Sequence, residues 1–316
     1  MAEQDHAPQR IVLTGATGFI GTHLQHQLLA SGHEVVAVVR PGSSRRANIF
    51  RGVELRAIAF NDATALRQLL ENADTVVHCA GAVRGRNLES FRPANIEALE
   101  NLVSAALAHK IAPRFILISS LAASRPQVSD YALSKHTGEQ VLRNAEGLQW
   151  VILRPPAVYG PGDTEMRPLF QSIRRGLALV IGPQMQRLSM LYVSDLATAV
   201  AATVIHHRVC AGQAFEIDDG HVDGYTWPEI IAAARSAMPV LRLPVPRLVL
   251  SILARVNIFF AGLIVYQPML TPGKVRELSQ PSWLCDNHTF SALTNWQPRV
   301  QLKDGVRATL KNAGRT

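Results

Sequence analysis

Apolar runs alternate along the first half of the chain with segments whose apolar residues recur at helical spacing. The first run, residues 11–13, predicts a buried strand, and residues 19–31 predict a helix that stops before Gly32. Repetition of this order is typical of a parallel sheet covered by helices on both faces. The sequence therefore predicts an α/β, doubly wound parallel sheet. Further strands are expected at 34–39, 53–60, 74–81, 115–118 and 151–153, and helices at 63–71, at 89–109 and from Tyr131.

A glycine-rich stretch connects the first strand to the first helix. Gly15 permits a tight turn, Gly18 lets backbone N–H groups approach a pyrophosphate, and Gly21 lets the helix pack close to the strand. The helix N-terminus would face the phosphates with unpaired N–H groups and the positive end of its dipole. A turn that binds nothing is the alternative, but the flanking strand and helix favour a dinucleotide site of the Rossmann type. The expected contacts are Gly15, Thr17, Gly18, Phe19, Ile20 and Gly21.

The end of the second strand predicts which dinucleotide is bound. NAD sites usually carry Asp or Glu about 20 residues past the glycines, for the ribose hydroxyls. Here that position holds Arg40, followed by Ser43, Ser44, Arg45 and Arg46. A carboxylate repels a 2′-phosphate, whereas a guanidinium binds it bidentately. A solvated basic loop is the alternative; we expect NADP, with NAD possible.

The fourth predicted strand ends in small residues, Cys79, Ala80 and Gly81, which leave room for a nucleotide at the carboxyl edge of the sheet. His78 and Cys79 are possible metal ligands. A buried His and Cys within a strand are more often core residues, and no metal-binding partners lie nearby in the sequence. No metal site is predicted.

Prolines and glycines over residues 154–163 mark an ordered loop and a domain boundary. We expect a dinucleotide-binding Rossmann domain over residues 8–160, with 187–212 returning to it. Residues 161–186 and 213–316 would then form a smaller, mostly helical, C-terminal substrate-binding part.

Composition narrows the class of protein. The chain has 316 residues, 47% of them hydrophobic and 18% charged, as in an ordinary soluble globular protein. The three cysteines, Cys79, Cys210 and Cys285, are far apart and suit a reducing compartment. Residues 1–9 are polar and show no secretory signal, so a cytoplasmic location is expected. The net charge of +8 comes from scattered arginines without a dense basic patch, which argues against nucleic-acid binding.

Residues 245–270 are unusually apolar. Arg247, Arg255, Asn257 and Gln267 interrupt the segment, and its longest apolar run, 258–266, is shorter than the ~20 residues that span a bilayer. No membrane span is therefore predicted. We expect a buried helix pair or a wall of the substrate pocket; the alternative is a peripheral membrane contact or an oligomer contact such as a homodimer interface.

Tyr131 and Lys135 are four residues apart on a predicted helix, so both side chains project from one face. The Lys135 ammonium should favour the phenolate and lower the pKa of Tyr131 toward the working range. Such a tyrosine can donate a proton to a ketone or take one from an alcohol. An exposed helical pair without a role is the alternative. Ser119-Ser120 ends the preceding strand, where a hydroxyl can reach the same carbonyl.

Together, these motifs resemble the extended short-chain dehydrogenase/reductase family, of the NAD-dependent epimerase/dehydratase-like kind. Their order and spacing cover most of the chain. The motifs are Thr14-Gly-Ala-Thr-Gly-Phe-Ile-Gly21, His78-Cys-Ala-Gly81, Asn95 in Ala-Asn-Ile-Glu-Ala-Leu-Glu-Asn-Leu, Ser119-Ser120, Tyr131-Ala-Leu-Ser-Lys135, Arg154-Pro-Pro-Ala-Val-Tyr-Gly-Pro161 and Tyr192-Val-Ser-Asp-Leu-Ala197.

The resemblance implies a catalytic role for four residues. Tyr131 would be the general acid/base, and Lys135 would tune the tyrosine and contact the nicotinamide ribose. Ser120 would hold the substrate oxygen, and Asn95 would support the site from the long helix. Further cofactor contacts are implied at Cys79, Ala80, Gly81, Pro155 and Val158.

Two departures from the family pattern bear on the ligands. Members commonly end the third strand in an Asp that contacts adenine, where this chain has Ala59-Phe60 and, slightly later, Asp62. Sugar-nucleotide members often place an Asn after the sixth strand, where this chain has Arg154-Pro155-Pro156. The second departure weakens the case for a nucleotide-sugar substrate.

These observations favour an NADP-dependent oxidoreductase that interconverts a ketone and an alcohol on a lipophilic small molecule. The alternative enzyme is a nucleotide-sugar epimerase or dehydratase, which retains its cofactor through turnover. A non-catalytic nucleotide-binding or assembly subunit is a third hypothesis. The intact Ser, Tyr and Lys argue against it, because a binding protein has no need of all three.

Overall fold

The computed structural model describes residues 7–44, 48–264 and 266–311. Its centre is a seven-stranded sheet in the order β11-β6-β5-β4-β1-β2-β3, and every strand pair in it is parallel. The predicted doubly wound Rossmann sheet is therefore confirmed. The strands are β1 (Arg10–Thr14), β2 (Glu34–Val39), β3 (Glu54–Ala57), β4 (Thr75–His78), β5 (Arg114–Ile118), β6 (Trp150–Arg154) and β11 (Gln213–Glu216).

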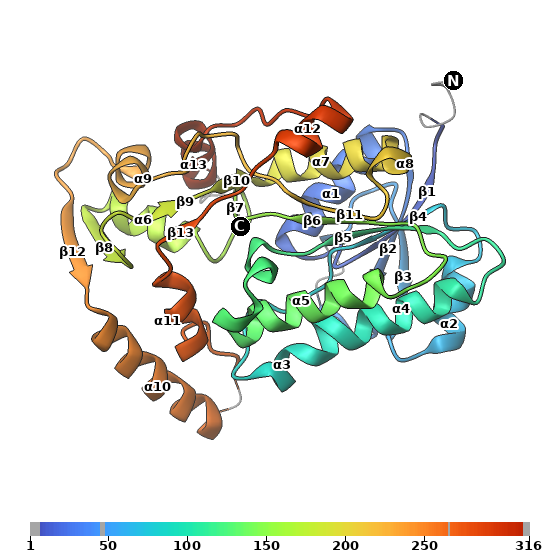
Figure 1. The fold of residues 1–316 in the computed structure, drawn as a ribbon, viewed down its shortest axis with the longest axis horizontal. Coiled ribbons are helices and arrows are strands. Elements are labelled where there is room, and N and C mark those ends of the chain that lie inside the picture. The colour runs from blue at the N-terminus through green and yellow to red at the C-terminus, as the bar shows by residue number, and fades with distance from the viewer. Residues whose placement is uncertain (1–6, 45–47, 265, 312–316) are drawn as a thin grey trace.

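Helices cover both faces of this sheet (Figure 1). Alternate residues of a strand point to opposite faces, so Ile11 packs on one side and Val12 on the other. One face is covered by α1 (Phe19–Ala30), α7 (Val193–Ile205), α8 (His207–Cys210) and α12 (His288–Thr294); the other by α2 (Ala63–Leu70), α4 (Ala98–Leu107) and α5 (Asp130–Arg143). With both faces buried, the strands have few polar residues, which explains their near-continuous apolar runs.

The predicted helix over 89–109 consists of three consecutive helical segments. They are α3 (Leu88–Arg92), a π-helical turn (Pro93–Glu97) and α4. A π turn inserts an extra residue and is frequent at functional sites. Here it contains the buried Asn95. Two short 3₁₀ turns, Leu121–Ser124 and Pro126–Val128, connect β5 to α5.

The remaining elements form the C-terminal part. Its core is built around Tyr159, Phe170, Met190, Ile230 and Val306, all fully or almost fully buried. The elements are β7 (Ala157–Tyr159), α6 (Arg167–Arg174), β8 (Leu177–Ile181), β9 (Arg187–Leu188), β10 (Met190–Tyr192), α9 (Trp227–Ala234), β12 (Leu241–Val245), α10 (Arg247–Leu263), α11 (Pro272–Leu278), β13 (Ser282–Trp283) and α13 (Leu302–Lys311).

Several segments differ from the expected division of the chain. Strands β7, β9 and β10 lie outside the central sheet, although residues 8–160 and 187–212 are expected in the Rossmann domain. Strand β11 pairs with β6 in the central sheet, although residues from 213 onward were assigned to the substrate-binding part. Helix α12 likewise packs on the central sheet through the buried Phe290. Short apolar segments after the domain boundary gave no local signal of which core they join, because that is decided by pairing with a distant strand.

The apolar segment 245–270 is not a buried helix pair. It forms α10, a single helix on the edge of the molecule whose neighbour is α11 (Figure 1). Most of its large apolar side chains are exposed, for example Leu248 at 70% and Phe259 at 66%. Across the described residues, no helix is both long enough and apolar enough to cross a membrane.

Candidate active site

The glycine turn after β1 has the close packing that the sequence predicts. Gly15 has a φ of +69°, and a Cβ atom there would lie 2.6 Å from the backbone nitrogen of Ala80. A Cβ atom on Gly21 would lie 2.1 Å from the Gly15 carbonyl oxygen. Both positions therefore exclude any larger residue, and α1 starts directly against the turn.

The N-terminus of α1 suits a pyrophosphate. Its N-cap, Gly18, has no side chain, whereas α2, α5 and α9 begin with side-chain caps from Asp62, Ser129 and Thr226. An uncapped helix N-terminus presents N–H groups and a positive dipole end to an anion. Thr17, Phe19 and Ile20 surround this N-terminus and are half-buried. These residues fit the phosphates of a dinucleotide.

The strand next to β1 ends in the predicted small-residue turn. Thr14 Oγ1 accepts a hydrogen bond from the Ala80 backbone at 3.2 Å and bonds His78 Nδ1 at 2.9 Å. Burial lowers the pKa of His78 to about 3, so this imidazole is a neutral core group. Burial also raises the pKa of Cys79 to about 12, which keeps its thiol protonated. No group of three or more potential metal ligands occurs among the described residues.

Asn95 holds the loop after β4 against α5. Its Oδ1 accepts a hydrogen bond from the Ala82 backbone at 2.7 Å, and its Nδ2 donates to Ser134 Oγ at 2.8 Å. A Cβ atom on Gly81 would lie 3.0 Å from Asn95 Oδ1 and 3.8 Å from Lys135 Nζ. Asn95 therefore positions Gly81 beside Lys135, which matches the supporting role implied for it.

The two serines after β5 have different partners. Ser119 Oγ donates a 2.6 Å hydrogen bond to Glu139, which is fully buried and pairs bidentately with Arg154 at 2.9 and 2.5 Å. Ser120 Oγ instead accepts a 3.2 Å hydrogen bond from the Ala122 backbone and lies close enough to the Tyr131 hydroxyl to lower the pKa of that phenol. Successive side chains of an extended chain point in opposite directions, which separates the two roles. The geometry brings Ser120 and Tyr131 together, as the sequence predicts.

The pKa of Tyr131 is raised, not lowered as predicted. Burial raises it to about 12; the hydrogen bond from Ser120 opposes the shift, and the negative charge of Glu277 adds to it. Desolvation outweighs the partners because phenolate is costly to form away from water. Tyr131 is consequently a protonated phenol at neutral pH, ready to donate its proton.

Lys135 reaches the carboxyl edge of the sheet from the next turn of α5. Its Nζ donates a 2.9 Å hydrogen bond to the Ile118 carbonyl at the end of β5. Burial lowers its pKa to about 8, opposed by the nearby Cys79 and Glu139. The ammonium is thus still the major form at pH 7 and lies beside the expected cofactor groove.

The remaining predicted cofactor contacts lie along the same edge. Arg40 is exposed directly after β2, in a turn that the Ser43 N–H closes onto the Arg40 carbonyl at 3.1 Å. Pro155 follows β6, and its carbonyl accepts a 2.8 Å bond from Leu121, while Val158 is half-buried. The basic residues Arg45 and Arg46 lie outside the described residues. Asp62 caps α2 by accepting a 3.0 Å hydrogen bond from the Ala65 backbone.

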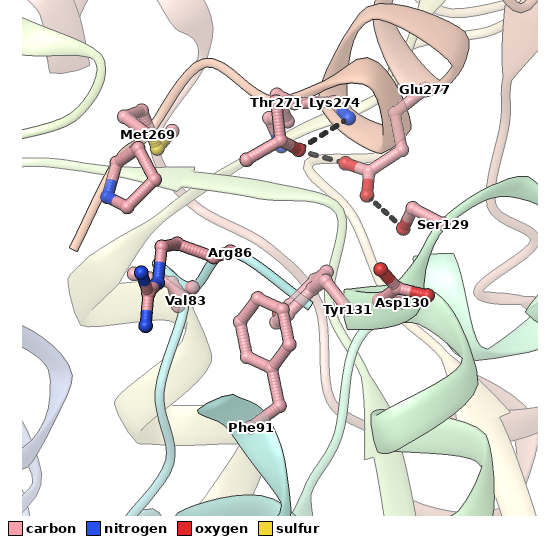
Figure 2. Close-up of a pocket in the computed structure, with 12 residues that line it drawn as sticks. Val83, Arg86, Phe91, Ser129, Asp130, Tyr131, Met269, Thr271, Lys274 and Glu277 are labelled. Carbon is pink, nitrogen blue, oxygen red and sulfur yellow. Dashed lines mark hydrogen bonds and ion pairs between the residues drawn. The ribbon is translucent and has the colours of Figure 1, made fainter. Parts of the chain in front are cut away.

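A pocket opens above Tyr131, between α3, α5 and the segment that follows α10 (Figure 2). The Phe91 ring lies 5.8 Å from the Tyr131 ring on its floor. Polar groups that the sequence analysis missed line the pocket. They are Arg86, Ser129, Asp130, Thr271, Lys274 and Glu277. No local motif marks these residues, because α11 meets α5 only through the tertiary fold.

Glu277 is the central polar group of the pocket roof. It accepts hydrogen bonds from Ser129 Oγ and from Lys274 Nζ, the latter at 2.7 Å (Figure 2). From 245–270, Pro268 and Met269 line the pocket, whereas Phe259 and Phe260 do not. The prediction that this segment forms a pocket wall thus holds for its last residues, and it is wrong for the two phenylalanines.

Comparison with known proteins agrees with this geometry. The model of the NAD dependent epimerase/dehydratase family matches residues 11–217. A ceramide reductase of Caulobacter vibrioides is 36% identical over 279 residues, which cover 86% of this chain and 85% of that protein. A UDP-glucose 4-epimerase of Vibrio cholerae is 30% identical, covering 76% of this chain and 79% of that protein. The crystal structure of UDP-glucuronic acid 4-epimerase from Bacillus cereus has a TM-score of 0.74 at 21% identity, covering 96% of this chain and 98% of that one.

The fold, the glycine turn and the Tyr131–Lys135 helix define an NAD(P)-dependent enzyme of the extended short-chain dehydrogenase/reductase type. More particularly, the chain belongs to the NAD dependent epimerase/dehydratase family. Both reductases and epimerases occur among its relatives.

Proposed function

We propose that this protein is an NADP(H)-dependent reductase that converts a ketone of a lipophilic small molecule to an alcohol. The observation that supports reduction is the Ser120–Tyr131 pair, in which Tyr131 remains protonated. An epimerase must first remove a proton from a sugar hydroxyl, which requires Tyr131 to be ionised, whereas a pKa of about 12 keeps Tyr131 protonated at neutral pH.

The residues of the site have separable tasks in this reaction. A nicotinamide cofactor bound along the glycine turn supplies the hydride. Ser120 donates a hydrogen bond to the carbonyl oxygen of the substrate, and Tyr131 delivers the proton that the developing alkoxide requires. Lys135 stabilises the negative charge that then forms on Tyr131, and its ammonium contacts the ribose.

Two further observations support the substrate and cofactor classes. The 36% identity to a ceramide reductase extends over 86% of the chain and 85% of that protein. Arg154-Pro155-Pro156 stands where sugar-nucleotide members often carry Asn, and Arg154 is engaged by Glu139. For the cofactor, the exposed Arg40 follows β2 at the position where an NAD site would carry a carboxylate.

The polar pocket roof refines the proposed substrate. The lining of this pocket includes Arg86, Asp130 and Thr271, which favours a substrate that carries a polar group over a purely apolar ketone. We therefore expect a long-chain molecule with a polar head near its ketone, such as a long-chain keto-amide. Its head would contact the pocket roof, and its chains would extend toward α10.

The test is a comparison of substrates with the purified protein. NADPH absorbance should fall with a long-chain keto-amide. Incubation with UDP-glucose should yield no UDP-galactose. Epimerisation of the sugar nucleotide without net NADPH consumption would overturn the proposal in favour of the epimerase.

A further inference from the structure

Most of the large apolar side chains of helix α10 point away from the protein. At 100° per residue they occupy one continuous arc of about 140° around the helix. The opposite stripe is buried, where Leu250 and Ala254 pack against Val275 of α11. The exposed members of the arc are Leu248, Val249, Ile252, Leu253, Val256, Phe259 and Phe260. We refer to these seven residues as the outer face of α10.

The sequence on either side of α10 carries basic residues but no acidic ones. Between Glu229 and Glu277 the sequence contains six basic residues and no Asp or Glu. Arg242, Arg247 and Arg255 are all exposed. A helix with an apolar face flanked by cations is typical of helices that lie in the interface of an anionic bilayer. The six basic residues are Arg235, Arg242, Arg247, Arg255, Lys274 and Arg276.

The helix is joined directly to the roof of the pocket. After α10 the chain returns to form the pocket residues Pro268, Met269 and Thr271. Asn257 Nδ2 donates to the Leu270 carbonyl at 2.9 Å, and Arg86 Nη1 donates to the Ala261 carbonyl at 3.2 Å. A surface in contact with α10 therefore lies beside the pocket entrance.

We propose that the outer face of α10 docks this protein on the surface of an anionic phospholipid bilayer. The apolar residues enter the boundary between headgroups and acyl chains, and the arginines contact lipid phosphates. Docking in this orientation lets a lipid substrate pass from the bilayer into the pocket. That last step rests on the proposed reductase function, whereas the docking itself does not.

Charge favours the bilayer over a second copy of the chain. A symmetric pair of outer faces would bring Arg255, which lies about 20° beyond one edge of the arc, toward its own copy, and the helix has no carboxylate to offset it. An anionic bilayer satisfies the apolar face and the cations together.

The experiment is flotation of the full chain with vesicles of phosphatidylcholine containing phosphatidylglycerol, compared with phosphatidylcholine alone. The wild-type chain should float with the anionic vesicles. Replacing both Phe259 and Phe260 with Ser should lower the partition coefficient at least tenfold, and Arg255→Gln about fivefold. Ile111→Ser is the matched control, because Ile111 is 87% exposed in the loop before β5 and should float as wild type.

Three outcomes would overturn the docking proposal. They are failure of the wild-type chain to float, flotation of the double Phe→Ser variant at the wild-type level, and a dimer by light scattering that this variant dissociates without any vesicle binding. Turnover of a short, water-soluble ketone should be unchanged in that variant, which shows that it is folded. Vesicle binding by a protein that reduces no ketone would support the docking and refute the reductase function.

Discussion

Ser119 donates its hydroxyl to the buried carboxylate of Glu139 over 2.6 Å, which commits the first serine of the pair to the interior. The second serine, Ser120, is thereby the one beside Tyr131. The alternation of an extended chain thus places two adjacent serines in different surroundings, one in the interior and one beside Tyr131 in the candidate site.

The serine pair gives a direct comparison of two variants. Ser120→Ala should lower kcat by about a hundredfold or more, because it removes a donor to the substrate oxygen. Its unfolding free energy should fall by only about 0.5–1 kcal/mol, because Ser120 Oγ caps the following 3₁₀ turn with a 3.2 Å hydrogen bond from the Ala122 backbone. Ser119→Ala should instead cost about 1–3 kcal/mol of stability, since Glu139 loses a buried donor. Steady-state kinetics and urea unfolding of both variants test this, and a reversal of the two effects would contradict the assignment.

Tyr131→Phe should abolish measurable turnover by removing the proton donor, an effect of about 10²–10⁴ for general acid catalysis. Cofactor affinity should survive, because the ring and its contact with Phe91 at 5.8 Å are kept. Fluorescence titration of NADPH and a turnover assay on the same sample separate the two quantities. Near-normal activity would mean that another group supplies the proton.

Cofactor binding should weaken as the pH rises through about 8. The pKa of Lys135 is lowered to about 8 by burial, so its ammonium predominates below that pH and its neutral amine above it. The dissociation constant of NADPH should therefore increase between pH 7 and 9. Lys135→Met should bind weakly with no such pH dependence, and its turnover should also be low. A pH profile that is the same in both proteins would exclude Lys135 as its source.

Comparing Gly21→Ala with Gly32→Ala distinguishes the effect of close packing at the turn from the effect of an unfavourable backbone conformation. A Cβ atom at Gly21 meets the Gly15 carbonyl oxygen at 2.1 Å, whereas one at Gly32 meets nothing within 4 Å but requires a φ of +82°. Gly32→Ala should cost about 1–2 kcal/mol of stability and leave NADPH affinity unchanged. Gly21→Ala should in addition weaken NADPH binding at least about tenfold, since it displaces the phosphate turn. Equal cofactor affinities in the two variants would argue against a phosphate site at this turn.

Arg40→Asp tests the cofactor preference. The wild-type protein should bind NADP(H) more tightly than NAD(H), by roughly tenfold to several hundredfold. The variant should narrow or reverse that preference, because a carboxylate repels the 2′-phosphate and accepts ribose hydroxyls. Titration of both cofactors against both proteins measures it. Tighter binding of NAD to the wild-type protein would refute the NADP assignment.

Local stereochemistry made much of the site predictable. Gly15 and Gly21 fit a turn and a close contact that exclude any side chain, and Tyr131 and Lys135 share a face of α5 simply through helical spacing. The positive φ of Gly15, the contact of Gly21 with the Gly15 carbonyl and the spacing of Tyr131 and Lys135 depend on neighbours within a few residues, so the sequence specifies them without knowledge of the fold. The same is true of the strand and helix order that determines the Rossmann sheet. The approach of Ala80 to Gly15, in contrast, depends on the pairing of β1 with β4.

Burial and long-range partners were decided only in the tertiary structure. The pKa of Tyr131 rises because the folded pocket removes water and brings Glu277 near it, and no spacing in the sequence encodes either effect. The apolar period of α10 is the same whether that face is buried or exposed. Its exposure follows because the fold packs α11, together with Ile181 and Val245, against the other side of the helix. The sequence by itself determined which elements form and where the cofactor turn lies; the tertiary structure decided which surfaces remain open to water, because burial is a property of the assembled chain.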